Sequence, residues 1–319
     1  MPKKIIVSLM LITIFLSACG SEQSSPVTIE QPEESSVAEE MVEEPTTEMP
    51  DYDRLEIESA DGTILVGSLH LPEGQGPFPA FVWVHGSGAV TRTQGGGSVV
   101  PALVEGGYAV LIMDKRGVGE SGGDYFGVSP VNSDFILGQL AEDTQAAAEF
   151  LSQLNIINPN QIGLFGNSQA GWIIPLAAAK SAEVSLAVIL VGPTVTVGEE
   201  NYYSSLTQEN SATLTEEKLE QVYERYSTFS GQRGFDPRES IEALHIPVLW
   251  VLGGKDSSIP TGETVRILDE IIAEYDKDFT VHIYPLGTHG LQNVENGEQI
   301  KFMDDMVYAW IEATLIALP

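Results

Sequence analysis

The sequence predicts an α/β protein built on a mostly parallel, twisted sheet with helices on both faces. Two observations carry this prediction. Short apolar runs typical of strands alternate with segments of helical periodicity, and turns rich in small residues follow several of the apolar runs. Such alternation favours crossover units, in which helices cover parallel strands and ligands bind at the carboxyl ends of the strands.

The elements are expected in a regular order along the chain. An antiparallel hairpin comes first, because residues 55–58 and 64–71 flank the turn signal Asp61-Gly62. Apolar runs predict further strands at 81–84, 109–113, 162–165, 186–191, 248–252 and 279–284. Helical patterns lie between them at 99–105, 140–154, 170–180 and 264–275, and a last helix is expected at about 299–316.

One insertion interrupts this rhythm. About 50 residues separate the strand expected to end near Val191 from the next one, which is too long for a simple connection. Residues 215–226 have the pattern of an amphipathic helix, so we predict a helical cap at about residues 196–243. Its aromatic side chains either line a substrate pocket or pack the cap onto the domain; they are Tyr202, Tyr203, Tyr226 and Phe229.

The most informative stretch is Gly166–Gly171, which reads Gly-Asn-Ser-Gln-Ala-Gly. It lies between a strand-like run and an apolar segment typical of a helix. A serine held between strand and helix by small residues is a nucleophile elbow, which lifts the hydroxyl above the sheet and points the helix N-terminus at its target. Ser168 is therefore the candidate nucleophile. Ala170 stands where glycine is usual, which is a mild departure because alanine is the next smallest side chain.

A nucleophilic hydroxyl needs a base, and the base needs an acid that orients it. Asp256 and His289 each come just after a predicted strand, so the chain order is serine, aspartate, histidine. This order differs from those of chymotrypsin and subtilisin. Asp114 precedes the serine, and no carboxylate follows Val191 until Glu199, so Asp256 is the best candidate for the acid.

Attack by the serine creates an oxyanion, which needs two converging N–H donors. We expect one donor to be the backbone N–H of Gln169, the residue after the nucleophile. The other is expected from Ser87 in the loop His85-Gly86-Ser87-Gly88, whose glycines let the backbone turn inward. His85 is expected to orient this loop through its ring nitrogens.

A further motif completes the pattern. Residues 114–121 read Asp-Lys-Arg-Gly-Val-Gly-Glu-Ser, similar to the Asp-x-Arg-Gly-x-Gly-x-Ser turn common in one superfamily. With the three motifs above, it makes the segment from about Ala60 to Leu318 resemble an α/β-hydrolase of the bacterial serine esterase or serine aminopeptidase-like type. The resemblance implies the α/β-hydrolase fold and a carboxylesterase-type Ser-Asp-His triad. Within the turn, Lys115 and Arg116 either contact a substrate carboxylate or fix local loops.

Three related classes fit less well. Prolyl aminopeptidases usually carry His-Gly-Gly-Pro-Gly where this chain has His-Gly-Ser-Gly at residues 85–88. Dehalogenases and epoxide hydrolases of this fold use an aspartate nucleophile, whereas this chain has Ser168. Acyl-CoA:amino acid acyltransferases use cysteine, and the only cysteine here is Cys19. No cluster of histidine, cysteine or carboxylate has metal-ligand spacing, so no metal is expected.

Residues 1–19 have the pattern of a lipoprotein signal peptide: a basic start, a short apolar run and small residues at the end. The apolar run is too short to span a bilayer comfortably. Leu16–Gly20 resembles a bacterial lipobox, in which Cys19 becomes the lipidated first residue of the mature protein. The alternative is a cleaved signal with an incidental cysteine. The lipobox predicts a protein of the cell envelope, lipid-anchored to a bacterial membrane and facing outward from the cytoplasm.

Residues 20–53 are dominated by Glu, Ser, Pro and Thr, and Tyr52 is their only aromatic residue. Such a stretch buries too little apolar surface to offset ordering, so we expect a disordered acidic tether before a hydrolase domain at 54–319. The formal net charge of −31 argues against nucleic acid or anionic membrane surfaces as partners. Solubility or a salty habitat is the plainer interpretation of this charge, and repulsion of anionic substrates is the other.

These features predict a serine hydrolase that cleaves carboxylic esters through an acyl-enzyme intermediate at the cell envelope, without a cofactor. A surface peptidase or aminopeptidase for short peptides stays open, because it needs an acidic residue for the free amino terminus and the expected cap holds Glu199, Glu200 and Glu209. A catalytically inactive ligand-binding protein is the third possibility. The expected partners are a small-molecule ester or peptide and, through Cys19, the membrane.

Overall fold

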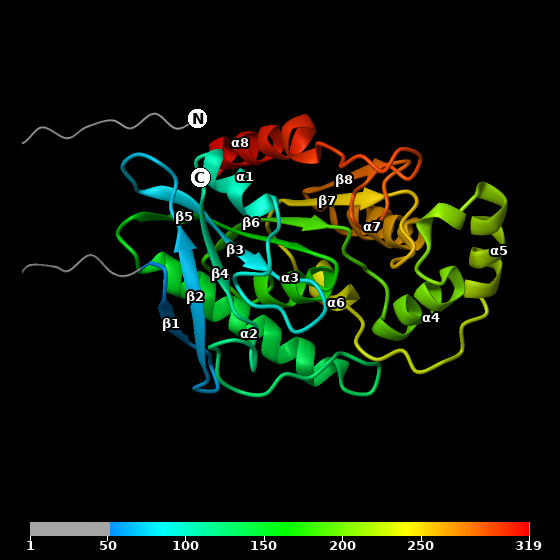
Figure 1. Cartoon of the computed structure of the whole chain (residues 1–319), viewed down its shortest axis with the longest axis horizontal. Coiled ribbons are helices and arrows are strands. Elements are labelled where there is room, and N and C mark those ends of the chain that lie inside the picture. Colours follow the sequence, from blue (N-terminus) through cyan, green and yellow to red (C-terminus); the bar gives the residue numbers. More distant parts are fainter. Residues whose placement is uncertain (1–51, 319) are drawn as a thin grey trace, which may run out of the picture. The chain divides into compact units, whose positions relative to one another are not determined.

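An eight-stranded sheet forms the centre of the domain (Figure 1). The computed structural model describes residues 52–318, which belong to the second of two units, Met1–Met49 and Pro50–Pro319. The predicted signal peptide, Cys19 and nearly all of the predicted tether lie outside the described residues.

The strand order in the sheet is β1-β2-β4-β3-β5-β6-β7-β8. β1 and β2 pair antiparallel, as the hairpin signal predicts, and β2 joins β4 antiparallel; the remaining pairs are parallel. The strands are β1 Leu55–Glu58, β2 Ile64–His70, β3 Phe78–Val84, β4 Ala109–Met113, β5 Ile157–Asn167, β6 Val184–Leu190, β7 Val248–Gly253 and β8 Phe279–Tyr284.

Helices cover both faces of this sheet (Figure 1). α1 and α8 lie on one face, where the Tyr308 hydroxyl of α8 donates to the Ala102 carbonyl of α1. α2 and α3 lie on the other. The helices are α1 Val99–Glu105, α2 Ser133–Ser152, α3 Ala170–Ala178, α4 Val197–Thr207, α5 Glu216–Tyr226, α6 Arg238–Glu242, α7 Thr261–Tyr275 and α8 Tyr308–Ala317, with a 3-10 turn at Ser211–Thr213 and a π-helical turn at Met303–Val307.

The expected elements are present, and the largest differences from prediction are in two of the helices. α2 begins seven residues before the predicted position of 140, because its apolar pattern is interrupted by the exposed Phe135 in the first turn. A turn in which the Asn132 side chain accepts hydrogen bonds from the backbone and hydroxyl of Ser129 leads into this helix. The last predicted helix is divided into the π-helical turn and α8.

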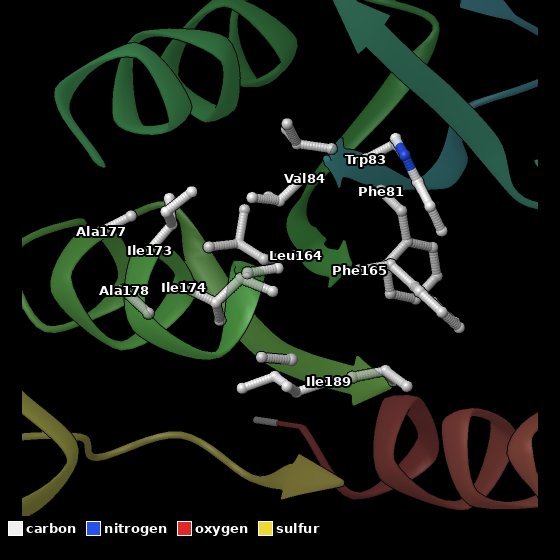
Figure 2. Packing of buried hydrophobic residues seen from close by; sticks show 14 of the residues in the cluster. Phe81, Trp83, Val84, Leu164, Phe165, Ile173, Ile174, Ala177, Ala178 and Ile189 are labelled. Carbon is white, nitrogen blue, oxygen red and sulfur yellow. The ribbon is translucent and has the colours of Figure 1, made fainter. Parts of the chain in front are cut away.

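The core is built on alternate side chains of β5. Leu164 lies with Ile173 and Ile174 of α3, and Phe165 lies on the opposite face with Phe81 and Trp83 (Figure 2). Phe165 meets Phe81 edge-to-face with ring centroids 5.9 Å apart, an arrangement that aromatic rings favour. The core thus fixes β3 and β5 side by side, which sets the positions of the loops that follow them.

A buried ion pair ties the Asp-Lys-Arg turn to α2. Arg116 is 6% exposed, and its guanidinium donates to both carboxylate oxygens of Asp143 at 2.5 and 3.1 Å. It also donates to Asp61 at 2.6 Å, and the Ser59 hydroxyl donates to Asp143 at 2.6 Å. Of the two roles left open for Arg116, the structure therefore places it in loop fixation.

Asp143→Ala should lower the free energy of unfolding by on the order of 3 kcal/mol, because it leaves a buried guanidinium with only the more exposed Asp61 as a charged partner. Glu56→Gln is the matched control, since it removes an exposed partner of Arg54 and should cost less than about 1 kcal/mol. Urea unfolding measures both. Similar losses in the two variants would contradict the structural role of the buried pair.

Candidate functional site

The turn at Ser168 is as tight as the sequence predicts. Ser168 has a φ of 55°, a strained conformation for a residue with a side chain, and its N–H donates to the Leu190 carbonyl at 2.9 Å. A Cβ on Gly166 would lie 2.4 Å from the Val84 carbonyl oxygen. A Cβ on Gly171 would lie 2.7 Å from the backbone of Gly192. Glycine is therefore required on both sides of the serine by close backbone approach.

The structure brings the three predicted triad side chains together. His289 Nε2 lies 3.0 Å from Ser168 Oγ, and His289 Nδ1 lies 2.8 Å from Asp256 Oδ2. Both distances are within hydrogen-bond range. These side chains come from the loops after β5, β7 and β8, at the carboxyl edge of the sheet. The arrangement can transfer a proton from the serine hydroxyl to an imidazole that a carboxylate orients.

Asp256 is held from two directions. Its Oδ1 accepts the backbone N–H groups of Ser258 and Ile259 at 2.7 and 3.0 Å, and the residue is 1% exposed. From the α4 segment, the Tyr203 hydroxyl donates to the Asp256 carbonyl at 3.0 Å and Thr207 donates to the Ser257 carbonyl. The inserted segment therefore supports the loop that carries the acid.

The environment of His289 favours its protonated form. Burial by itself would lower the pKa of His289, but the charge and hydrogen bond of Asp256, with smaller contributions from Glu200 and Glu209, raise it. Burial also raises the pKa of Glu200 to about 7, opposed by His289. A carboxyl group of the cap is thus electrostatically coupled to the imidazole.

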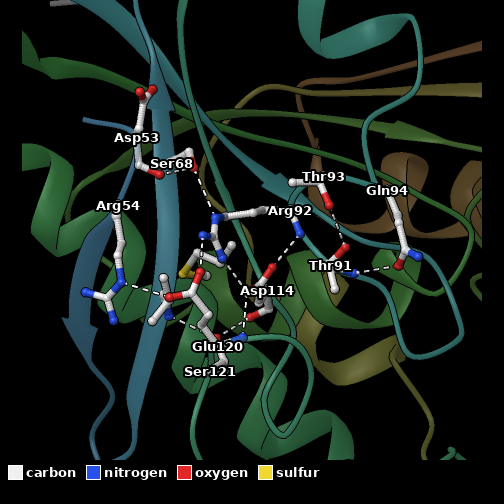
Figure 3. Close-up of polar contacts among 12 residues, drawn as sticks. Asp53, Arg54, Ser68, Thr91, Arg92, Thr93, Gln94, Asp114, Glu120 and Ser121 are labelled. Atoms are coloured by element: carbon white, nitrogen blue, oxygen red, sulfur yellow. Dashed lines mark hydrogen bonds and ion pairs between the residues drawn. The ribbon is translucent and has the colours of Figure 1, made fainter. Parts of the chain in front are cut away.

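The other candidate acids have structural partners instead. Glu199 accepts hydrogen bonds from the backbone and hydroxyl of Thr196, which form a capping box at the start of α4. Asp114 accepts from the backbone and guanidinium of Arg92 and from the Glu120 N–H (Figure 3). Asp114 thereby ties the loop after β3 to the turn after β4, and neither carboxylate reaches His289.

The two residues predicted to form the oxyanion hole lie on the same pocket as Ser168. Gln169 precedes α3, and Ser87 lies in the loop after β3. A Cβ on the neighbouring Gly86 would lie 3.3 Å from the Ser168 Cβ, so this loop runs directly against the nucleophile turn. His85 is buried, and its Nε2 lies 2.6 Å from the Met113 carbonyl oxygen, in keeping with the expected orienting role.

For Lys115 the sequence left two roles open, contact with a substrate carboxylate or fixation of local loops. Its ammonium donates to the Gly86 carbonyl at 2.5 Å and to the Gln169 side-chain oxygen at 3.0 Å. It therefore joins the two segments that carry the predicted oxyanion donors. Its position directly after the end of β4 was the available signal, but the sequence does not say which loops an ammonium there would meet. Burial lowers the pKa of Lys115 to about 8.

Two pockets open beside Ser168. The larger has a volume of about 690 Å³ and is lined by His289, the glycine-rich loop 94–98, and Glu200 and Glu209 of the cap segment. The smaller has a volume of about 200 Å³ and is lined by Gln169 together with apolar side chains of Tyr125, Val128, Trp172, Pro193, Val197 and Ile259. Ser87 and Glu200 line both. Ser168 thus borders two pockets whose lining residues differ.

The cap aromatics pack instead of lining these pockets. Tyr203 and Tyr226 form a small core with Leu206 and Val222, and Tyr202 packs against both this core and Phe229. None of the four aromatic residues considered from the sequence lines either pocket.

Among residues 52–318, no group of three or more histidine, cysteine or carboxylate side chains is arranged to hold a metal ion. In the same part of the chain, no helix is both long and apolar enough to cross a membrane.

Comparison with known sequences gives matches over most of the domain. The sequence model of the prolyl oligopeptidase family matches residues 97–316. Esterase EstD of Thermotoga maritima is 27% identical over 239 residues, covering 66% of this chain and 55% of that protein. Polyketide transferase claH of Penicillium crustosum is 30% identical over 156 residues, covering 49% of this chain and 48% of that protein. The chain spans about half the length of these curated relatives.

Solved structures share the fold at low sequence identity. The Pyrococcus furiosus esterase Pf2001 superposes with a TM-score of 0.57 and 16% identity, covering 83% of this chain and 89% of that one. Dipeptidyl peptidase 4 of Porphyromonas gingivalis gives a TM-score of 0.58 and 16% identity, covering 82% of this chain and 35% of that one. The predicted α/β-hydrolase fold is confirmed.

The free energy of unfolding of the wild-type protein should increase with pH because of Lys115, and Lys115→Met should abolish this increase. Because burial lowers the pKa of Lys115 from 10.5 to about 8, the unfolded chain binds more protons than the folded protein between these values, and its unfolding free energy increases with pH there. Urea unfolding at pH 8, 9 and 10 measures this increase. Lys301→Met, at an exposed position, should retain it. If the free energy of unfolding of Lys115→Met still increased with pH as in the wild-type protein, the lowered pKa of Lys115 would not be the cause of the increase.

Proposed function

This chain belongs to the prolyl oligopeptidase family, and from that premise we propose that it is a serine hydrolase that cleaves carboxylic esters through an acyl-enzyme intermediate. The observation that carries the proposal is the hydrogen-bonded series Asp256–His289–Ser168 beside a pocket. The similarity to Esterase EstD and to the Pf2001 esterase supports ester cleavage.

Acylation begins when Ser168 Oγ attacks the ester carbonyl carbon. His289 Nε2 takes the hydroxyl proton as the new Oγ–C bond forms, and the carbonyl oxygen becomes an oxyanion. The backbone N–H groups of Ser87 and Gln169 hold that oxyanion, and Lys115 keeps their two segments together. His289 then donates its proton to the alcohol oxygen, the C–O bond breaks and the alcohol leaves.

Deacylation repeats these steps with water. His289 removes a proton from a water molecule, whose oxygen attacks the acyl-enzyme carbonyl carbon. The second tetrahedral intermediate collapses, the Oγ–C bond breaks, and the proton returns from His289 to Ser168. Asp256 stabilises the imidazolium in both halves and holds its tautomer. These steps need no cofactor.

Hydrolysis of short peptides is the second candidate, and Glu200 is the observation that favours it. This partly buried carboxyl lines both pockets beside the nucleophile, and Glu209 lines the larger one. A carboxylate at this position would pair with the free amino group of a peptide. Glu199 is less suited to this role, because it is engaged at the start of α4 and pairs with Arg233.

We also propose that the protein acts at the cell envelope, anchored by lipid at Cys19. The support is the sequence Leu-Ser-Ala-Cys-Gly at residues 16–20, after a short apolar run. A diacyl anchor stabilises membrane attachment by about 0.8 kcal/mol per buried methylene, so attachment would be stable. The acidic segment at 20–53 would then separate the hydrolase domain from the bilayer.

Ser168→Ala should reduce ester hydrolysis by on the order of 10⁴-fold or more, because nucleophile and base act as a unit. Asp256→Asn should be severely impaired but less so, since asparagine fills the site without stabilising the imidazolium. Hydrolysis of p-nitrophenyl acetate measures both. Glu199→Gln is the control for the acid, because Glu199 is the alternative carboxylate. Loss of activity in Glu199→Gln, with Asp256→Asn fully active, would show that the acid is misassigned.

Glu200→Gln should separate the two candidate substrates. If peptides are the substrate, kcat/KM for amino-acid anilides should fall about tenfold or more relative to p-nitrophenyl acetate, because an ammonium partner is lost. If esters are the substrate, as proposed, the wild-type protein should hydrolyse p-nitrophenyl acetate and leave the anilides largely uncleaved. Glu217→Gln, on the exposed first turn of α5, is the matched control.

Protein isolated from its native envelope should begin at a Cys19 that carries lipid. Mass spectrometry of the N-terminal peptide identifies both the cleavage site and the added mass. Cys19→Ser should prevent lipid attachment and release the protein from the membrane fraction. Recovery of an unmodified thiol at Cys19, or cleavage at another position, would refute the anchor.

A further inference from the structure

We propose that the two pockets beside Ser168 divide an ester between them, the larger pocket taking the alcohol and the smaller pocket taking the acyl group. This inference rests on the proposed serine hydrolase function. It assigns a substrate class: esters that join a short apolar acyl group to a bulkier polar alcohol without negative charge.

The position of His289 identifies the side on which the alcohol leaves. After Nε2 has taken the proton of Ser168, it must donate that proton to the departing oxygen, which therefore lies within hydrogen-bond reach of the imidazole. His289 lines the larger pocket and does not line the smaller one. The alcohol accordingly departs into the larger pocket.

The position of Gln169 identifies the opposite side. Gln169 lines the smaller pocket and does not line the larger one. The carbonyl oxygen must meet the backbone N–H of Gln169, and the remaining substituent of the carbonyl carbon is the acyl chain. With the alcohol on the His289 side, the acyl chain extends into the smaller pocket.

The smaller pocket shares Glu200 with the larger one, and the apolar side chains in the rest of its wall favour a short apolar group. Val128, Val197 and Ile259 offer only aliphatic surface. The indole N–H of Trp172 is already bonded to the Val195 carbonyl at 2.8 Å, so this side chain contributes an apolar face. The volume of about 200 Å³ is below the range of about 300–1,000 Å³ that is usual for drug-sized ligands.

The larger pocket has a different character. Its volume of about 690 Å³ admits a bulkier group. Glu200 and Glu209 lie in its wall, and the Ser204 hydroxyl donates to Glu209 at 3.0 Å. Within the described part of the chain, no lysine or arginine lines this pocket. These acidic side chains, with no lysine or arginine beside them in the pocket wall, would disfavour an anionic alcohol and accept hydrogen bonds from hydroxyl or ammonium groups.

Paired substitutions test this division. Val128→Phe narrows the smaller pocket and Ser98→Phe narrows the larger one. Val128→Phe should raise the preference for p-nitrophenyl acetate over p-nitrophenyl butanoate by about tenfold, the discrimination that a few methylenes give in a pocket. Ser98→Phe should leave this ratio unchanged. For acetate esters of ethanol and 3,3-dimethylbutanol, Ser98→Phe should instead disfavour the bulky alcohol, and Val128→Phe should not.

The effect of positive charge on the alcohol group is tested with acetylcholine and 3,3-dimethylbutyl acetate, which have nearly the same shape. Wild-type protein should prefer the cationic ester several-fold, and Glu209→Gln should reduce this preference.

Val128→Ala, which widens the smaller pocket, should shift the acyl preference in the direction opposite to Val128→Phe. This second variant separates a pocket effect from a folding defect, and circular dichroism checks the fold of each variant.

The opposite pattern would overturn the proposal: Val128→Phe changing the alcohol preference and Ser98→Phe changing the acyl preference. Unchanged ratios in both variants would also overturn it, because neither pocket would then select substrate. Failure of the proposed function is a distinct result. In that case wild-type protein would not hydrolyse these esters through Ser168, and Ser168→Ala would equal wild type in every assay.

Discussion

The close approach of two pairs of backbone segments around Ser168 is the constraint on which the rest of the site depends. Gly166 of β5 lies against the Val84 carbonyl of β3, and Gly171 of α3 lies against Gly192 in the loop after β6, both at distances that no Cβ permits. Ser168 lies between these two glycines and has a positive φ. Parallel strands then place the loops after β7 and β8 at the same edge of the sheet, where Asp256 and His289 complete the hydrogen-bonded series.

The inserted segment between β6 and β7 has two structural roles that are linked. Tyr203 and Thr207 bind the backbone of the loop that carries Asp256. The same helix presents Glu200 to both pockets. A change in α4 would therefore affect both the orientation of the imidazole and the lining around the substrate. Its aromatic side chains stabilise this arrangement by packing with one another, away from the pockets.

Charge near the nucleophile is arranged unevenly. The chain has a formal net charge of −31, and carboxylates gather around His289, where they raise its pKa. Next to the predicted oxyanion donors, the charged group is instead a cation. The Lys115 ammonium is buried, with its pKa lowered, and bonds two neutral oxygens, those of Gly86 and Gln169. A buried cation at this place would favour the negative charge that develops on a carbonyl oxygen during attack.

The sequence by itself determined the fold class, the sheet edge used by the site, and Ser168, Asp256 and His289 as one group. These follow from local signals, because strand periodicity, small residues around a serine and chain order do not depend on distant contacts. Only the tertiary structure decided that Glu200 faces the pockets, whereas its neighbour Glu199 belongs to a capping box whose Thr-x-x-Glu pattern is local. It also decided that Lys115 joins two loops. Such assignments depend on segments far apart in the chain meeting in space, and no local pattern encodes which of them meet.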